Sequence, residues 1–280
     1  MFKMDIPIGD FVEKFIQLLL NNFQPFFDAQ ADYLNSFMDN FGYILLSIPP
    51  LFFIIVLSLI AWFLVNKKTA AFTALGLLLI FGMKLWQLFI ETFVLVILST
   101  SISLIIGIPI GILMSKRKVL NKIILPILDF MQTMPSFVYL IPAVMFFGIG
   151  NVPGIISTVI FSMPPAVRLT KLGLEQVPND LEEVGRAFGL TNFQMLYKIK
   201  LPLALPSIMA GINQSIMMAL SMVVAASMIG TRGLGSQVLS GIQRNDIGIG
   251  FEAGLAVVIL AIILDRITRS LGLKTQNKNA

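Results

Sequence analysis

Seven stretches of mostly apolar residues alternate with short polar segments along the chain of 280 residues. A helix needs about 20 apolar residues to cross the hydrocarbon core of a bilayer, and each stretch is near that length. The predicted spans are 43–65, 69–86, 89–114, 125–149, 153–172, 206–229 and 251–270. The second is short, and the fourth contains Pro135 and Pro142. The pattern predicts an all-α polytopic membrane protein with about seven transmembrane helices.

Residues 1–41 have a different pattern from the rest of the chain. Phenylalanine and leucine side chains alternate with acidic residues and asparagines. This alternation predicts an amphipathic helix that is too polar to span and lies at the membrane interface. Pro25 should kink or divide that helix. The many phenylalanines make a disordered tail the less favoured alternative.

The basic residues indicate how the chain is oriented. With seven spans, 15 of the 20 Lys and Arg residues fall on one side of the membrane. Cytoplasmic loops are rich in Lys and Arg, so this side is predicted to be cytoplasmic, with the N-terminus outside and the C-terminus inside. The net charge of +5 follows the same rule and does not indicate a nucleic-acid partner. The expected divisions are an external interfacial segment, two accessory spans, a core and a cytoplasmic tail, at 1–41, 42–88, 89–272 and 273–280.

Composition limits the chemistry that the chain can perform. It is 56% hydrophobic and 12% charged and has no cysteine or histidine. Thiol and imidazole catalysis, Cys/His metal sites and disulfides are therefore excluded. The chain also lacks the G-x-x-x-x-G-K-[ST] phosphate loop, so we expect no catalytic residue, metal or cofactor in it. The few acidic residues of the spans fall near the span ends, which argues against proton coupling and favours a neutral or zwitterionic solute.

Glycines and prolines mark the expected bends. Pro164 and Pro165 should break the fifth span, and the glycine-rich segment 230–250 should form an outer re-entrant loop with turns at Gly233 and Gly235. The sixth span carries polar and soft side chains that are either contacts between helices or the lining of a pathway, and the sequence leaves both open. The candidate pathway or gate residues are Pro164, Pro165, Asn213, Gln214, Ser215, Met218 and Ser221.

The segment 180–202 is the most polar long stretch in the second half of the chain, and it is predicted to form a stiff elbow at one membrane face. Asp180 should cap a short helix, with Glu183 as its partner in a capping box. Gly189 should end that helix in the left-handed conformation. A second piece then carries apolar residues at three- and four-residue steps and ends at Pro202. Its predicted apolar face is Leu190, Phe193, Leu196, Tyr197 and Leu201.

This elbow resembles the loop signature of ABC-transporter permeases, E-A-A, three residues, G, nine residues, I, one residue, L-P. The matching positions are Glu183, Gly189, Ile199, Leu201 and Pro202. Val184 and Gly185 replace the two alanines of the signature. The resemblance implies a coupling helix that docks into an ATPase subunit, formed by Asp180, Glu182, Glu183, Val184, Gly185, Arg186, Ala187 and Gly189. Ile199, Leu201 and Pro202 would then belong to the structure of the elbow.

The resemblance extends beyond the elbow. Residues 89–272 look like the type I ABC permease core of five spans. The runs 128–150, 161–178 and 210–230 are similar to the glycine betaine/proline betaine permease subunits of bacterial osmoprotectant importers. The resemblance implies a bacterial cytoplasmic membrane, a second permease copy, two ATPase subunits that hold ATP and magnesium, and an extracytoplasmic solute-binding protein.

The solute and the energy source have alternatives. An ABC permease for an amino acid such as methionine shares the physical features derived above. A sodium-coupled secondary carrier would need inverted repeats, and a mechanosensitive channel would leave the elbow unexplained. The chain has only two Trp and four Tyr. Since these residues form the cages that hold quaternary ammonium groups, high-affinity recognition is expected in the binding protein.

Overall fold

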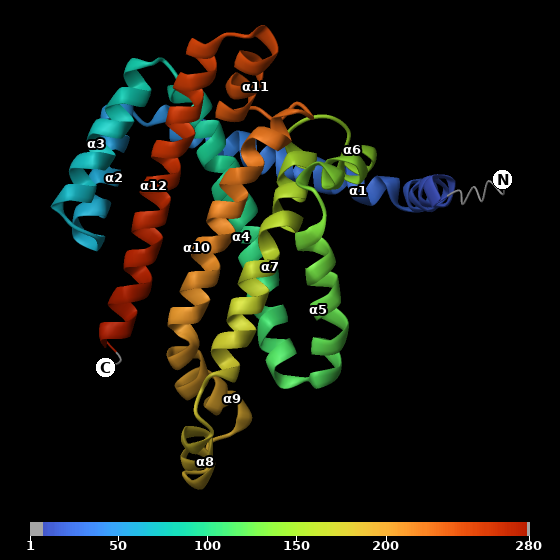
Figure 1. Cartoon of the computed structure of the whole chain (residues 1–280), viewed down its shortest axis with the longest axis vertical. Helices are drawn as coiled ribbons and strands as arrows, with labels where there is room; N and C mark the ends of the chain where they lie inside the picture. The colour runs from blue at the N-terminus through green and yellow to red at the C-terminus, as the bar shows by residue number, and fades with distance from the viewer. Residues whose placement is uncertain (1–7, 279–280) are drawn as a thin grey trace, which may run out of the picture.

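A computed structural model describes residues 8–278, and those residues are α-helical apart from short connections (Figure 1). The first half contains α1 (Ile8–Ser47), α2 (Pro50–Leu64), α3 (Lys67–Gly82), α4 (Trp86–Lys116), α5 (Lys118–Thr133), the 3-10 turn η1 (Ser136–Tyr139) and α6 (Leu140–Phe147). The second half contains α7 (Asn151–Glu175), α8 (Asn179–Ala187), α9 (Asn192–Met195), the π-turn η2 (Leu196–Lys200), α10 (Leu201–Ser227), α11 (Leu234–Arg244) and α12 (Ile247–Lys278). The all-α prediction is confirmed.

The core forms where α4, α7 and α10 pack against one another, with α12 against α10 on one side (Figure 1). Small residues let these helices approach closely, as is common between membrane helices. Gly107 of α4 faces Ala166 of α7, and Gly173 of α7 faces Ser207 of α10. Buried hydroxyls add polar contacts: Ser103 donates to the Val159 carbonyl over 3.1 Å and lies 2.8 Å from the Ser162 hydroxyl.

Gly111 provides a test of this close packing. A Cβ added at Gly111 would lie 2.6 Å from the Val167 carbonyl oxygen and 2.8 Å from Thr170 Cβ. Because α7 backbone cannot yield as a flexible side chain does, Gly111→Ala should destabilise the fold by about 1–3 kcal/mol. Thermal unfolding of the purified protein measures this effect. Gly254→Ala is the control, since nothing lies within 4 Å of its Cβ position. Equal melting temperatures for the two variants would contradict the prediction.

Four helical stretches are long and apolar enough to cross a membrane: α4, α7, the continuous run Asn192–Ser227, and Ile247–Gly272 of α12. They correspond to the third, fifth, sixth and seventh predicted spans. The number rises to six if each of two sharply bent helix pairs counts as one span. The predicted count of seven is therefore not confirmed.

The first bent pair joins α1 to α2. The predicted first span, 43–65, is wrong at its start, because α1 continues to Ser47 and the chain then turns by 96° into α2. Pro25 lies inside α1 and does not divide it. Figure 1 shows α1 running across the direction of the core helices. The Phe27 ring of α1 packs on Phe146 and Phe147 of α6, at centroid distances of 4.7 and 5.7 Å. An interfacial position for α1 stays a prediction.

The second bent pair contains most of the predicted fourth span, 125–149. α5 ends at Thr133, and the chain turns by 109° before η1 and α6. The bend falls at Pro135, whose ring disfavours helical conformation in the residue before it. Met134 accordingly has an extended backbone, with ψ 136°. Across the bend, the Tyr139 hydroxyl donates to the Met131 carbonyl, so the turn is held by a side chain from its far side.

Two other expected breaks are absent. Pro164 and Pro165 lie buried inside an unbroken α7, because proline's fixed φ is compatible with a helix and neighbouring helices hold it in place. In the glycine-rich segment, Gly233 has φ +124° and precedes α11, as predicted for a turn. The turn predicted at Gly235 is wrong, since this residue lies within α11.

Candidate functional site

The elbow lies at the far end of the molecule, where α8 and α9 connect the ends of α7 and α10 (Figure 1). α8 begins at Asn179, after Pro178, and no side chain caps it. The predicted cap at Asp180 and its capping box with Glu183 are therefore wrong. Pro178 sets the entry into the helix, and Asp180 and Glu182 instead lie in its first turn, where they complement the helix dipole.

A capping box does form at the start of α9, with Thr191 as the N-cap. The Thr191 hydroxyl accepts from the Gln194 N–H over 3.3 Å, and the Gln194 side chain accepts from the Thr191 N–H over 2.9 Å. Between the two helices Gly189 has φ +74°, which confirms the predicted left-handed end. The Leu190 N–H donates to the Gly185 carbonyl over 3.0 Å and closes the turn.

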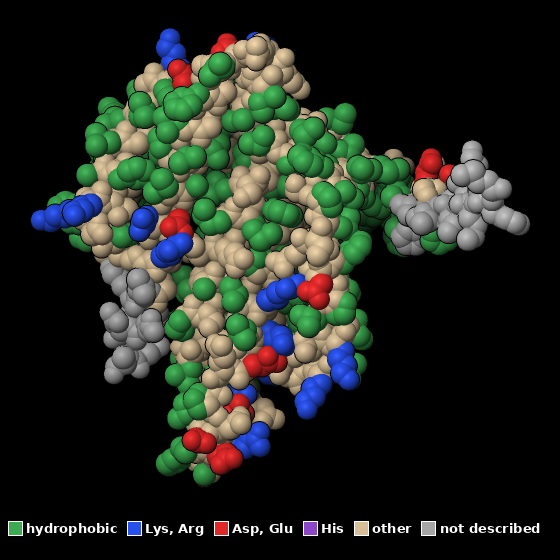
Figure 2. Space-filling view, in the orientation of Figure 1, with side chains coloured by type: hydrophobic (Ala, Val, Ile, Leu, Met, Phe, Trp, Pro, Cys, Tyr) green, Lys and Arg blue, Asp and Glu red, His purple; other side chains and the backbone are tan. Residues whose placement is uncertain are grey.

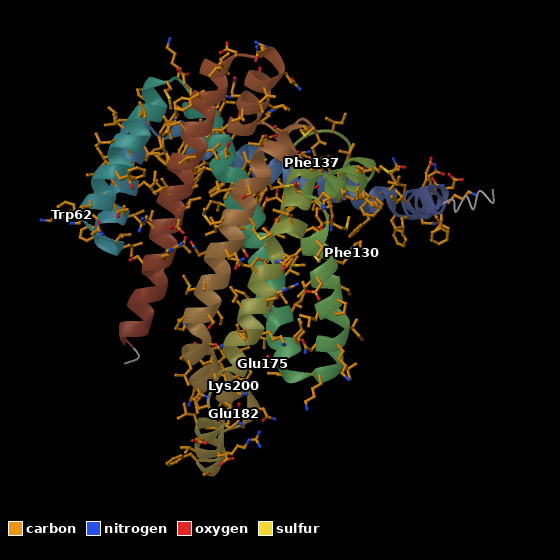
Figure 3. The ribbon with its side chains drawn as sticks, viewed as in Figure 1. Trp62, Phe130, Phe137, Glu175, Glu182 and Lys200 are labelled. Carbon is orange, nitrogen blue, oxygen red and sulfur yellow. The ribbon has the colours of Figure 1, made fainter. Side chains whose placement is uncertain are left out.

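The two pieces of the elbow pack through Gly185. Its Cβ position would be 2.6 Å from Met195 Cε and 3.0 Å from Ile199 Cδ1, so only a very small side chain fits. Next to this contact Glu182 forms an ion pair with Lys200, and Arg186 lies 4.0 Å from the same carboxylate. Figure 3 shows Glu182 and Lys200 close together at the base of the elbow. These contacts fix the angle between α8 and the start of α10.

The second piece does not end at Pro202, as the sequence predicted. The helix passes from α9 through the π-turn into α10, and Pro202 lies in the first turn of α10. The Leu201 N–H donates to the Leu196 carbonyl five residues back. The hydrogen-bond ladder thus changes register directly before the residue that has no N–H to donate. The elbow is consequently continuous with a membrane helix, and a displacement of α8 would move α10.

A cleft of about 620 Å³ separates α8 and α9 from the ends of α4 and α7. Ser115 and Lys116 of α4, Glu175 of α7 and Glu182 of α8 line it. Glu175 is paired with Lys171 at 3.0 Å, so the charges on this wall are largely compensated. The cleft is a surface feature of the elbow base and not an enclosed site.

The outer side of the elbow is apolar. We name five exposed side chains the tip surface: Leu181, Val184, Phe188, Phe193 and Tyr197. Phe188 is 83% exposed. Figure 2 shows hydrophobic side chains among acidic and basic ones at this end of the molecule. Exposed apolar clusters with a polar rim mark protein-protein contact sites.

The predicted apolar face of the second piece is split in the structure. Phe193 and Tyr197 point outward on the tip surface, whereas Leu196 and Leu201 pack on Leu174 and its neighbours. Met195, which the periodicity did not single out, is the residue that becomes buried. Helical spacing therefore located the apolar positions but did not show that some of them are exposed and others pack within the chain.

The candidate pathway residues do not lie together on one surface. Gln214 and Ser221 lie on an exposed stripe of α10, together with Met217. Ser215 is buried, and Met218 is half-buried. Pro164 and Pro165 are buried in α7, and the Pro165 carbonyl lies 3.2 Å from the Cβ position of Gly211. These prolines take part in helix packing within the chain.

Asn213 contacts a side chain of another helix, which the sequence did not reveal. Its amide donates to Asp265 of α12 over 2.9 Å, and Arg269 donates to the same carboxylate oxygen over 2.8 Å. A second pair, Asp129 of α5 with Arg168 of α7, lies 2.5 Å apart. The i,i+4 spacing of Asp265 and Arg269 was visible in the sequence, whereas the contacts between helices were not. Among residues 8–278, no cluster of three acidic side chains is placed to hold a metal ion.

We compared the chain with known protein families and with similar proteins. Residues 103–276 match the family described as binding-protein-dependent transport system inner membrane component. The chain is 46% identical over 273 residues to the glycine betaine transport system permease protein OpuAB of Bacillus subtilis, covering 98% of this chain and 97% of that protein. It is 48% identical over 278 residues to the glycine betaine/carnitine transport permease protein GbuB of Listeria monocytogenes, covering 98% of each.

The fold has a solved counterpart. An inward-facing structure of the MetNI methionine ABC transporter aligns with a TM-score of 0.60 at 21% identity, over 68% of this chain and 95% of that one. At this identity the likeness shows the fold alone. The relatives are permease subunits of transporters, and the family implies an ATPase subunit and a solute-binding protein as partners. The chain therefore belongs to the binding-protein-dependent inner-membrane transport components, the multi-pass permeases of ABC importers.

Proposed function

We propose that this chain is the permease of an ATP-driven importer for glycine betaine or a related zwitterionic solute. Similarity over nearly the whole length to glycine betaine permeases carries the proposal. A second candidate is a permease for an amino acid such as methionine, which would share the physical features derived from the sequence. Residues 89–272 would form the transport core and 42–88 two accessory helices, with an external segment at 1–41 and a cytoplasmic tail at 273–280.

The assembly that we propose contains two copies of this permease in a lipid bilayer and two ATPase subunits. The distribution of basic residues supports an outside N-terminus and a cytoplasmic C-terminus, which leaves the elbow in the cytoplasm. The tip surface supports docking of the ATPase there, because its apolar side chains are exposed in an aqueous position. ATP and magnesium would be held by the ATPase, and solute recognition would reside in the extracytoplasmic binding protein.

The elbow contacts support a mechanical role. Closure of the ATPase dimer would move α8, and the Gly185 contact and the Glu182–Lys200 pair would transmit that movement to α10. The cavity between the two permeases would then open outward and accept solute from the docked binding protein. ATP hydrolysis would reverse the movement.

Uptake into proteoliposomes that contain the permease, its ATPase and the binding protein tests the proposal. Glycine betaine should accumulate only with ATP in the compartment that the ATPase faces. Uptake without ATP would indicate a secondary carrier or a channel. Competition by proline betaine but not by methionine is expected, and the reverse pattern would favour the amino-acid permease.

A charge reversal in α8 should uncouple transport. Glu183 is exposed on the helix that we propose as the docking element, and Glu183→Arg puts a positive charge in the N-terminal half of α8, against the helix dipole. Uptake and transport-stimulated ATPase activity should fall at least tenfold, while the complex still binds the solute-binding protein. Glu252→Arg, an exposed carboxylate at the start of α12, is the control. Normal uptake by Glu183→Arg would show that this helix does not couple.

A further inference from the structure

A groove of about 670 Å³ lies between α10 and the second half of α12. Three of its lining side chains are polar, Asn213 and Gln214 of α10 and Arg269 of α12. The other lining residues are Pro206, Met209, Ala210 and Met217 of α10 and Gly272 of α12. The groove therefore combines a cation, two amides and soft apolar groups on two membrane helices.

A hydrogen-bonded cluster forms the polar wall. Asp265 Oδ1 accepts from Asn213 Nδ2 over 2.9 Å and from Arg269 Nε over 2.8 Å. Arg269 is 64% exposed, and its ion pair with Asp265 uses Nε and not the two terminal nitrogens. The Asn213 carbonyl oxygen is buried and has no hydrogen-bond partner among the side chains that the structure describes. The cluster thus keeps donors and an acceptor unused.

The depth of the cluster in the membrane is informative. At 1.5 Å per residue, Asn213 lies about 21 Å from the Ser227 end of α10, and Asp265 and Arg269 lie about 27 and 33 Å from the start of α12. For a hydrocarbon core of about 30 Å, the cluster therefore extends from inside the core to its boundary on the side of the elbow. An ionisable side chain inside the core faces a protein interior or a water-filled path and not lipid. The groove is therefore expected to face the elbow end of the pathway.

We propose that this groove is a binding station for the zwitterionic solute on its way through the permease. The terminal N–H groups of Arg269 bind the solute carboxylate together with the Gln214 amide. Asp265 is hydrogen-bonded to the lining residues Asn213 and Arg269, and its carboxylate would lie on the side of the cationic end of the solute. The methionines contact the methyl groups of that end. The cluster carries one positive and one negative charge, so the groove stays neutral when it holds a zwitterion.

The same charges give the groove a selectivity. Arg269 and Asp265 already compensate each other, so the empty groove has no net charge. A cation without a carboxylate, such as choline, adds a net positive charge and has no group for the terminal nitrogens of Arg269, and an anion without an ammonium group adds a net negative charge. A net charge away from water is costly, so each half-matched solute should bind less well. This station rests on the proposed function and adds to it the residues that meet the solute inside the membrane.

Binding and uptake measured together test the station. The permease–ATPase complex, without the binding protein, is placed in nanodiscs of defined phospholipid, and saturation-transfer NMR follows the N-methyl signals of added glycine betaine and choline. Wild-type complex should give a glycine betaine signal and at least tenfold less for choline. Arg269→Gln and Asp265→Asn should each lose the signal. In proteoliposomes that also contain the binding protein, each should lower the maximal uptake rate at least tenfold. Glu252→Gln, on the same helix, should match the wild type in both measurements.

The double variant Asp265→Asn/Arg269→Gln distinguishes a solute station from a purely structural role of the Asp265–Arg269 pair. This variant leaves no unpaired charge and keeps an acceptor for Asn213, so a structural role predicts that uptake recovers. A solute station predicts that uptake stays at least tenfold low although the complex assembles and melts as the wild type does. Recovery of uptake, equal signals for choline and glycine betaine, or a phospholipid retained in place of the signal would overturn the station. Wild-type complex that binds and imports another zwitterion but not glycine betaine would overturn the proposed substrate alone.

Discussion

Replacing Gly185 by leucine should abolish ATP-driven transport while the membrane helices remain folded. The Gly185 Cβ position is 2.6 Å from Met195 Cε and 3.0 Å from Ile199 Cδ1, so the three further carbons of leucine have no space. α8 would have to separate from α9 and the π-turn, and this displacement would also break the Glu182–Lys200 ion pair. Overpacking of this kind costs about 1–3 kcal/mol. That cost falls on the contact that we propose transmits force, so uptake should fall more than tenfold.

Gly185→Ala is the matched control for this variant. The nearest obstacle to a single Cβ is the flexible end of Met195, which can move aside, and alanine stands at this position in the permease loop signature. Alanine should therefore keep more than half of the wild-type uptake. The measurements are uptake, ATPase activity stimulated by loaded binding protein, and the melting temperature of the complex. If leucine transports as well as alanine does, the contact at Gly185 does not transmit the movement.

Replacing Phe188 by aspartate should release the ATPase from the permease. Phe188 is the most exposed side chain of the tip surface, with 83% of its area accessible, so little of it is covered by the described chain. Buried aromatic side chains commonly contribute 2 kcal/mol or more to a protein interface. A charge in place of the ring would add a desolvation penalty. The affinity for the ATPase should fall by about 30-fold or more, since each 1.4 kcal/mol is a factor of ten.

Co-purification of the ATPase with tagged permease measures this effect, and titration of the ATPase onto permease in nanodiscs gives the dissociation constant. Ile247→Asp is the control, because Ile247 is equally exposed, at 84%, but lies at the start of α12 and outside the tip surface. It should leave ATPase binding unchanged. Unaltered binding by Phe188→Asp would place the docking surface elsewhere.

Some features of this structure depend only on a short stretch of sequence, and those could be predicted. Gly189 ends α8 in the left-handed conformation as predicted, since the conformational freedom of glycine depends on no distant contact. The third, fifth, sixth and seventh apolar stretches form long helices because transfer of about 20 apolar residues into lipid is a property of the stretch itself. The cap predicted at Asp180 was wrong by comparison, because Pro178 already sets the start of α8 and a short-range pattern cannot rank two competing starts.

The bends of the helices, and the absence of a break in α7, could not be predicted from short stretches of sequence. Hydropathy indicates that 125–149 prefers lipid, but the 109° bend between α5 and the η1–α6 segment depends on Pro135 and on the Tyr139 hydroxyl that reaches back to α5. In the same way, Pro164 and Pro165 were expected to break a helix, and packing against α10 keeps it straight enough to remain one element. Both outcomes depend on neighbours that a local pattern does not include.

By itself the sequence determined the class of the protein, the polar elbow with its glycine break, and the resemblance to ABC permeases, because composition, solvation and turn conformation act over a few residues. Only the tertiary structure decided that Gly185 contacts Met195, that Phe193 is exposed while Leu196 packs within the chain, and that Asn213 bonds to Asp265. Asn213 and Asp265 are 52 residues apart in the chain. They come together because of the angle and register at which α10 packs on α12, and those depend on the side chains of both helices at once.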